Sequence, residues 1–362
     1  MSIKYNGGYI PAVGADGQIL VADSSTSTGL RYNPTSAAGK NAVINGGMDI
    51  WQRGTSIAIP ASSQYYTCDR FVVNPGANAA TTVSRQLTSD TTNLPNIQYC
   101  ARVQRNSGQT GTTTQFIGGA LESTNSIPFA GKQVTLSFYA RAGANFSAAS
   151  NILSYHIFTG TGTDQALFSF TGQVDNALNA TLTTTWQKFT QTITVPTAAT
   201  QLATAFGFTP TGTAGANDYF EITGVQLELG STATTFSRAG GTIQGELAAC
   251  QRYYWRWSSA NTNYNHFGMG MTDSTSNSSE VVRSLPVIMR NPPSFNAPTP
   301  TKFNVNYYGT GSYGTTSISA DVVSADTVAI VFTGSGTGLG TGYATRVYAI
   351  DTTAYLEFSA EL

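Results

Sequence analysis

The chain has 362 residues with 18 Lys and Arg against 19 Asp and Glu, so its net charge is −1 and only 10% of its residues are charged. An average soluble domain carries about 25% charged residues, and so few charges attract a phosphate backbone weakly, which argues against a nucleic-acid partner. A protein surface with so few charges also does little to prevent association with other chains, which favours burial of part of that surface in an assembly. No run reaches the roughly 18 apolar residues of a membrane span, and the first residues lack a secretory signal, so we expect synthesis in a cytosol and no membrane insertion.

Residues 1–40 form a separate segment rich in Gly, Pro, Ser and Thr, with one short apolar run at Ile19-Leu20-Val21. A segment with so few apolar side chains cannot bury enough surface to fold alone. We therefore expect an extended N-terminal arm that folds against a partner or against other copies of the chain.

Residues 41–238 are predicted to be one all-β domain. Val134, Leu136 and Phe138 alternate with polar residues in KQVTLSFYAR, which is typical of a strand with one buried face. Similar short runs follow one another with turn-rich spacers between them, and no helical period competes before Ile243. This pattern predicts a sandwich, a jelly roll or a barrel.

The strand that closes this domain, within Tyr219–Leu229, changes phase in its middle. Phe220 and Ile222 fall in one alternation phase, whereas Val225, Leu227 and Leu229 fall in the other. One face can bury both sets only if an extra residue is inserted between them. We predict that bulge at Thr223-Gly224, because glycine tolerates the backbone conformation that a bulge often needs.

A single helix is predicted in the connector, residues 239–256. Ile243, Leu247, Cys250 and Tyr254 recur at spacings of four, three and four, which predicts one apolar stripe. Thr242 is placed to cap the first turn. The helix would separate the first domain from a second β-unit.

Residues 257–362 are predicted to form that second unit, a small β-sandwich. Phe267, Met269 and Met271 alternate with other residues, and later runs behave in the same way. Those later runs are Leu285 to Met289, Phe303 to Tyr307, Val328 to Phe332 and Leu356 to Ala360.

The sequence offers little for catalysis. Its two histidines, His156 and His266, do not accompany a G-x-S-x-G elbow, and strand-forming residues follow the glycines at Gly309–Gly314, where a nucleotide site needs a helix. Cys68, Cys100 and Cys250 form no C-x-x-C pair and are expected to be buried thiols. We expect no enzyme activity, no cofactor and no metal, although two carboxylates brought together from distant strands could still cleave a polysaccharide.

Aromatic side chains are abundant near loops of the second unit. Sugars present apolar C–H faces that stack on exposed Trp and Tyr, while amide and guanidinium groups bind their hydroxyls. The same aromatic residues could instead fill a core or a subunit interface, and a unit in which Trp257, Tyr308 and Tyr313 are all buried would contradict the first interpretation. The candidates for glycan binding are Trp257, Tyr264, Asn265, Tyr308 and Tyr313.

Several segments resemble the strands of jelly-roll carbohydrate-binding modules in order and approximate spacing. They are NAVINGGMDIWQRG, YYTCDRFVV, VTLSFYARA, TTWQKFTQTITVP and YFEITGVQLELGS. The structural calcium of that family uses an acid in the closing strand, where this chain has Thr223-Gly224, although Asp49 and Glu228 are present. This departure argues against a metal site.

A tighter set of motifs resembles tail-fibre and related virion proteins of bacteriophages. The set comprises N-G-x-x-x-x-W-Q-R-G, Y-T-x-D-R, V-Q-L-E-x-G-x-x-A-T-x-F-x-R, C-Q-R-Y-Y, P-V-x-M-R and a final A-E-L. We call the residues that carry these motifs and their nearest acid the framework residues: Asn45, Gly46, Asp49, Trp51, Arg53, Asp69, Arg70, Glu228 and Arg238. The three arginines are expected to pair with the three acids or to bind backbone carbonyls.

The resemblance implies a phage tail fibre or receptor-binding protein that is assembled in the host cytoplasm and works in the virion as a homotrimer. The N-terminal arm would bind other tail, baseplate or virion proteins, and loops of the second unit would bind a host-surface glycan without catalysis. Two alternatives remain open, a purely structural capsid or collar component and a polysaccharide-depolymerising tailspike.

Overall fold

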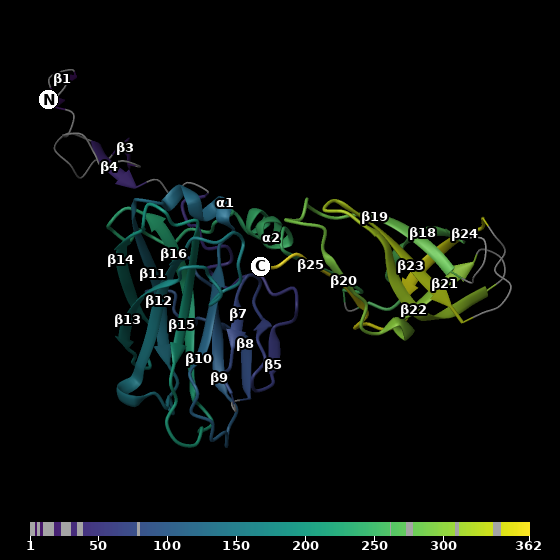
Figure 1. Ribbon diagram of the computed structural model, residues 1–362, viewed down its shortest axis with the longest axis horizontal. Helices are drawn as coiled ribbons and strands as arrows, with labels where there is room; N and C mark the ends of the chain where they lie inside the picture. Colours follow the sequence, from purple (N-terminus) through teal and green to yellow (C-terminus); the bar gives the residue numbers. More distant parts are fainter. Residues whose placement is uncertain are drawn as a thin grey trace.

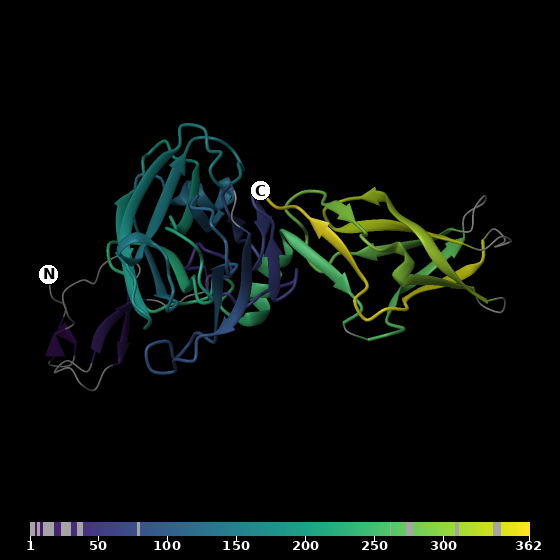
Figure 2. The same cartoon turned by 90° about the horizontal axis from the view of Figure 1, so that it is seen from below.

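The computed structural model describes residues 39–77, 80–260, 262–272, 278–307, 311–335 and 342–362, together with four strands near the N-terminus. These strands pair as two antiparallel hairpins, β1 (Lys4–Tyr5) with β2 (Gly8–Tyr9), and β3 (Gln18–Ala22) with β4 (Leu30–Pro34). Figures 1 and 2 place the hairpins on the side of the body opposite to the second unit. Within the described residues no helix is long and apolar enough to cross a membrane.

The body is a sandwich of two six-stranded antiparallel sheets. In order across the first sheet lie β14 (Gln187–Thr194), β11 (Gln133–Ala142), β16 (Tyr219–Leu229), β9 (Tyr99–Arg105), β8 (Thr81–Leu87) and β5 (Ser56–Ile59). In order across the second lie β13 (Val174–Thr181), β12 (Ile152–Gly160), β15 (Gln201–Phe208), β10 (Gln115–Ala120), β7 (Val72–Asn74) and β6 (Tyr65–Tyr66). The chain passes from one sheet to the other at most connections, as in a jelly roll. Short helical turns lie at α1 (Ser123–Ser126), η1 (Ile127–Phe129) and η2 (Ala149–Asn151).

The core of the body lies between the two sheets and contains the apolar residues expected from β11. Val134, Leu136 and Phe138 are fully buried, but Thr135 and Ser137 are buried as well, at 1% and 2% exposure, so the strand does not have the single buried face predicted for it. The ring of Phe138 contacts Tyr155 and Phe206 of the opposite sheet, at centroid distances of 5.0 and 4.7 Å. The all-β class and the sandwich body predicted from the sequence are therefore confirmed.

The bulge predicted in the closing strand is present in β16. Ser137 pairs with Gln226 and Tyr139 pairs with Thr223, so β16 has one residue more than β11 over this interval. Gly224 takes a φ of 60° there. The extra residue returns Val225 and Leu227 to the core face, where both are fully buried, whereas Leu229, at the end of the strand, is 52% exposed and was wrongly included in the buried set.

Helix α2 (Ile243–Gln251) begins at Thr242, whose hydroxyl accepts a 3.1 Å hydrogen bond from the Gly245 amide. The predicted apolar stripe is only half correct. Cys250 is buried, but Ile243 is 42% exposed and Leu247 is also exposed. Tyr254 is buried after the helix has ended, in β17.

The side chain that anchors α2 is instead a carboxylate. Glu246 is buried and accepts hydrogen bonds from the backbone amides of Asn45 and Gly240. The helix therefore docks by satisfying two buried donors rather than by burying its whole apolar stripe. Burial raises the pKa of Glu246.

The second unit contains a closed barrel and a small sheet rather than the sandwich expected from the sequence. The barrel order is β18 (His266–Thr272), β19 (Ser278–Ser284), β23 (Thr327–Gly334), β22 (Gly311–Val323), β21 (Phe303–Tyr307) and β24 (Ala344–Ala349). The ring closes because β18 pairs with both β19 and β24. A sandwich and a barrel share the same alternation, so the sequence pattern alone does not separate them. The small sheet has the order β17 (Tyr254–Ser258), β25 (Tyr355–Ser359) and β20 (Ser294–Asn296), and a turn η3 (Pro300–Lys302) precedes β21.

A bulge at the start of β18 reverses the alternation there. His266 pairs with Tyr348 and Gly268 pairs with Val347, so Phe267 is the extra residue. Phe267 points into the core and is fully buried, whereas Met269, in the same sequence phase, is 77% exposed. The alternating residues of this strand therefore do not share one face.

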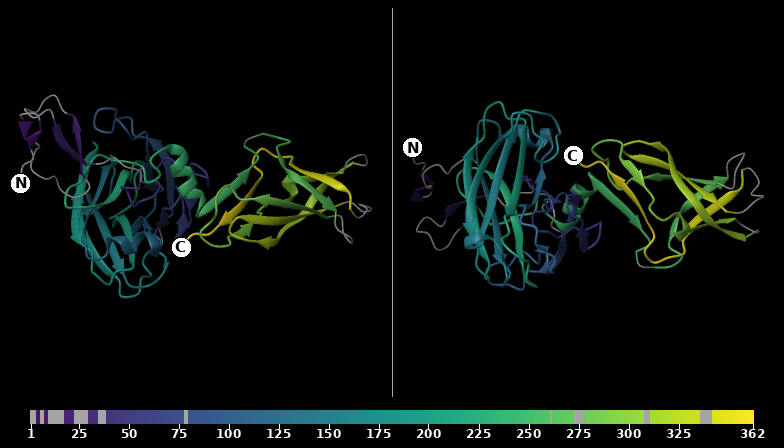
Figure 3. Two further views of the ribbon diagram at one scale, coloured as in Figure 1. Left: turned by 90° about the horizontal axis from the view of Figure 1, so that it is seen from above. Right: turned by 60° about the horizontal axis from the view of Figure 1, so that its bottom comes forward.

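The body and the second unit have separate cores and lie side by side along the long axis of the molecule (Figures 1 and 3). Helix α2 and the C-terminus both lie between them (Figure 1). The last residues of the chain thus return to the junction at which the second unit begins.

Candidate functional site

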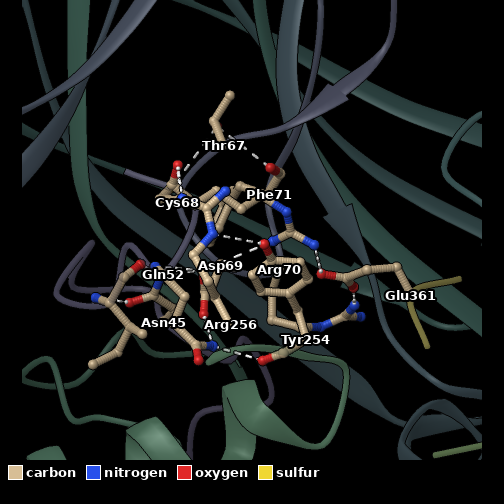
Figure 4. Close-up of polar contacts among 12 residues, drawn as sticks. Asn45, Gln52, Thr67, Cys68, Asp69, Arg70, Phe71, Tyr254, Arg256 and Glu361 are labelled. Atoms are coloured by element: carbon tan, nitrogen blue, oxygen red, sulfur yellow. Dashed lines mark hydrogen bonds and ion pairs between the residues drawn. The ribbon is translucent and has the colours of Figure 1, made fainter. Parts of the chain in front are cut away.

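Five of the six motifs that carry the phage resemblance contribute to the junction between the two units, and the sixth, V-Q-L-E-x-G-x-x-A-T-x-F-x-R, stays within the body. Glu361, next to the C-terminal residue, forms ion pairs with Arg53, at 3.2 Å, and with Arg70. These three side chains are only 5%, 9% and 6% exposed, respectively. Figure 4 shows the carboxylate of Glu361 facing the guanidinium of Arg70.

The backbone of the C-terminal segment is held as well. Arg290, the last residue of the P-V-x-M-R run, donates hydrogen bonds of 2.9 and 3.0 Å to the carbonyls of Ala360 and Glu361. The Tyr66 hydroxyl donates to the carbonyl of Leu362 at 3.1 Å. Residues far apart in the sequence therefore hold the C-terminal segment, residues 360–362, in place.

Asp69 lies beneath this network and is fully buried. It accepts hydrogen bonds from the backbone amide and the side chain of Gln52, at 3.1 and 2.5 Å, and lies 3.8 Å from Arg53 (Figure 4). Gln52 also donates to the carbonyl of Tyr254 at 2.6 Å. Burial raises the pKa of Asp69 to about 6, against the opposing effect of Arg53.

Stacking of arginine on tyrosine completes the junction. The guanidinium of Arg53 lies 3.4 Å from the ring centroid of Tyr254, and that of Arg70 lies 3.6 Å from the ring of Tyr253. Such contacts are most stabilising where water is excluded. The hydroxyl of Tyr253 donates to Glu122 of the body at 2.8 Å.

The other framework residues also have structural partners. Arg238 pairs with Asp49 at 2.7 Å, one of the pairings expected, and Glu228 binds Thr234 and Lys40. Asn45 exchanges hydrogen bonds with the backbone of Ile50 and donates to the carbonyl of Asp69. The last two framework residues are packed into the body: Gly46, where a Cβ would meet Val225 O at 2.0 Å, and Trp51, which donates to the Met48 carbonyl.

The groups with catalytic potential are scattered. The Nδ1 of His156 lies 2.9 Å from Asp175 and its ring stacks on Phe158, far in sequence from His266 on the barrel. The three cysteines are buried free thiols, as expected, and burial raises the pKa of each. Among the described residues no three His, Cys, Asp or Glu side chains are grouped so as to hold a metal ion.

An aromatic and polar surface lies on the outer face of the barrel around Tyr348. The ring of Tyr264, which is 68% exposed, lies 5.7 Å from that of Tyr348, and His266 lies 6.4 Å from it. The hydroxyls of Ser312 and Tyr348 are 2.5 Å apart. We call this surface the Tyr348 patch, formed by Tyr264, His266, Asn304, Ser312, Arg346 and Tyr348.

The strand register explains why these side chains meet. Asn304 pairs with Tyr348 on one side and with Gly314 on the other, and its amide donates to Ser312 at 3.0 Å. Because directly paired residues point to the same face of a sheet, this row faces outward while Val305 fills the core. Arg346 belongs to the next outward row and donates to Asn306 at 3.0 Å.

The residues nominated from the sequence fall in different places. Tyr264 lies in the Tyr348 patch. Asn265 is a loop anchor, because its side chain donates to the carbonyl of Ser258 at 3.3 Å. Trp257 packs between Trp255 and Phe267 in the core of the second unit and stays partly exposed.

Of the remaining two nominated residues, Tyr313 of β22 is partly exposed and pairs with the inward-facing Val305. Tyr308 lies outside the described residues. Trp257 and Tyr313 are therefore not fully buried. Sequence reasoning missed Tyr348, Arg346 and Asn304, although the alternation of N-V-N-Y places both asparagines on one face.

The sequence matches no protein-family model and none of the curated proteins. Among solved structures the chain is similar to a carbohydrate-binding module of family 4, with 20% identity and a TM-score of 0.26 over 36% of this chain and 71% of that one. It is similar to the enzymatically active domain of tailspike protein 4 of bacteriophage CBA120, with 12% identity and a TM-score of 0.32 over 52% of this chain and 21% of that one. A putative sugar-binding protein from Bacteroides thetaiotaomicron VPI-5482 has 12% identity and a TM-score of 0.34, over 52% of this chain and 100% of that one.

Proposed function

We propose that this protein is a non-catalytic receptor-binding fibre protein of a bacteriophage, which attaches the virion to glycans on the host surface. The observation that carries the proposal is the Tyr348 patch. The exposed ring of Tyr264 and the partly exposed ring of Tyr348 lie beside amide, hydroxyl and guanidinium groups, the combination that stacks on sugar C–H faces and binds sugar hydroxyls. Tyr264 and Tyr348 would provide the stacking surface, and Asn304 and Arg346 the hydrogen bonds.

The rest of the chain serves this function as a support. Among the framework residues Arg53, Asp69 and Arg70 help to hold the body and the second unit together, and the N-terminal arm would join the chain to other tail, baseplate or virion proteins. Each patch would bind a glycan weakly, so useful adhesion requires several linked copies. A homotrimer assembled in the host cytoplasm would supply them.

The test is binding of the full-length protein to an array of bacterial surface polysaccharides and to host cells. Replacing Tyr264 and Tyr348 together by Ala is expected to weaken binding about tenfold or more, since each aromatic contact contributes roughly 1 kcal/mol. Tyr343→Ala is the matched control, because it removes another exposed tyrosine, at the opposite end of β24.

Three results would contradict the proposal. Binding that survives loss of both rings would place the receptor site elsewhere, for example among the loops near Tyr343. No binding to any glycan or host cell would favour a purely structural virion component. Shortening of the bound polysaccharide, measured by size-exclusion chromatography, would show a depolymerase.

A further inference from the structure

A groove of about 760 Å³ lies at the junction and shares no lining residue with the Tyr348 patch. One wall is the edge of the body at β5 and β6, and the other is a face of the small sheet β17-β25-β20. Figure 1 shows β5 facing β25 and β20 across the junction. None of the residues nominated from the sequence for glycan binding lines this groove.

The strand register gives the small sheet one apolar and one polar face. Trp255, Phe358 and Phe295 pair across the three strands and pack into the core. The next row, Arg256, Glu357 and Asn296, points into the groove. A sheet with one face on a core leaves such a row open to a ligand.

This polar row is fixed before any ligand arrives. Glu357 accepts hydrogen bonds from Tyr254 at 2.5 Å, from Arg256 at 2.6 Å and from Asn296 at 2.9 Å. Burial would raise the pKa of Glu357, but these hydrogen bonds lower it below its usual value, so the group stays a carboxylate. Preorganised groups of this kind bind without a large ordering penalty.

Two tyrosines add stacking surfaces from opposite walls. Tyr65 of β6 is 53% exposed. Tyr355 of β25 is partly exposed, and the guanidinium of Arg256 lies 4.0 Å from its ring centroid. Both rings line the groove, so a flat ligand could contact one from each unit.

The guanidinium at the base of the groove has its partners within the protein. Arg53 lines the groove, and within the described part of the chain its Nη1 is buried without a hydrogen bond, 3.8 Å from Asp69. Because this nitrogen is buried, its charge is met by Asp69 and Glu361 and not by a ligand in the groove.

The charges select a neutral ligand. Arg53 and Arg70 are matched by Asp69 and Glu361, and Arg256 is matched by Glu357, so the groove has no excess charge for a phosphate or an acidic sugar. Fixed donors and acceptors between two tyrosine rings suit a molecule with apolar faces and many hydroxyls. We propose that this groove is a second binding site, for a neutral oligosaccharide held between Tyr65 and Tyr355 with its hydroxyls on Arg256, Glu357 and Asn296.

The test uses the full-length protein with neutral gluco-, galacto- and manno-oligosaccharides, a uronic-acid oligosaccharide and an extended peptide as probes. Binding is measured by saturation-transfer NMR and calorimetry. Tyr65→Ala and Asn296→Ala change exposed side chains, so both variants should fold. Each is expected to weaken binding of a neutral oligosaccharide severalfold or more, and the double variant to abolish it.

The double variant Tyr264→Ala with Tyr348→Ala separates this site from the proposed receptor site. Neutral oligosaccharide binding should persist in that variant and disappear in the groove variants. Loss only in the Tyr264 and Tyr348 variant would overturn the groove proposal while leaving the receptor proposal intact. Failure of all neutral probes, or preference for the acidic sugar or the peptide, would also overturn it.

Discussion

Removal of Glu361 tests the junction directly. In Glu361→Ala two buried guanidiniums lose their carboxylate, Arg53 at 3.2 Å and Arg70 in closer contact. Breaking a buried ion pair by removing one partner destabilises a protein by about 3–5 kcal/mol. Arg53 would keep Asp69 at 3.8 Å and Arg70 would keep the Ala120 carbonyl at 2.8 Å, so we expect the lower end, about 3 kcal/mol.

Calorimetry and limited proteolysis measure the two consequences. About 3 kcal/mol corresponds to a fall in Tm of roughly 6 °C or more, and the connector 239–256 should become easier to cleave as the units separate. Asp321→Ala is the control, because Asp321 is an exposed carboxylate of the second unit. Glu361→Gln keeps the shape without the charge and should fall between the two. A Glu361→Ala protein with the Tm and cleavage rate of the control would refute the role assigned to this ion pair.

Three further predictions test other parts of the structure. Because burial raises the pKa of Asp69 to about 6, the folded state keeps a proton that the unfolded state releases, so stability should fall by roughly 1–3 kcal/mol as pH rises from about 4 to 6. Urea unfolding measured across this pH range should show a smaller fall in stability for Asp69→Asn. An equal fall in both proteins would contradict the prediction. Gly224→Ala should lower the free energy of unfolding by about 2 kcal/mol or more, because the new Cβ would lie 2.7 Å from Ile97 and the backbone has a φ of 60° there. Gly230→Ala is the control, since Gly230 also has a positive φ but lies in open space, and it should shift the denaturation midpoint less. The double variant Ile243→Ser and Leu247→Ser should change the stability of a single chain by less than about 1 kcal/mol, because both side chains are exposed. Light scattering would reveal any loss of oligomer. A large fall in stability with no change in oligomeric state would contradict the exposure of these two residues.

The body could be predicted from the sequence because its signals are local. The alternation in β11 identifies the face of that strand that joins the core, although its polar face is buried too, and the phase change between Ile222 and Val225 requires a bulge wherever the strand lies. Both depend on neighbours within a few positions. The barrel could not be predicted in the same way, because its closure depends on pairing between His266 and Tyr348, far apart in the chain.

The candidate sites also combine features that local sequence predicts with features that depend on contacts between distant residues. Tyr264 could be nominated from its loop, but the Tyr348 patch exists only because the register of β21 and β24 brings Asn304 beside Tyr348. Likewise, the acid that pairs with Arg70 is not its neighbour Asp69 but Glu361, at the other end of the chain. In the sequence Trp257 stands between polar residues, which favours an exposed position. Only the three-dimensional packing shows that it contacts the core of the second unit.

The junction and the groove depend on the same strand. β25 supplies Tyr355 and Glu357 to the groove, and two residues after it Glu361 pairs with the body. The groove can keep its shape only while this end of the chain is docked, because its other wall belongs to the body. Glu361→Ala should therefore weaken oligosaccharide binding in the groove at temperatures where both units remain folded. The Tyr348 patch lies entirely within the barrel and its adjoining loop, so its glycan binding should be unchanged in the same protein. Equal loss at both sites would instead mean that Glu361 supports the fold of the second unit as a whole, and not the position of that unit on the body.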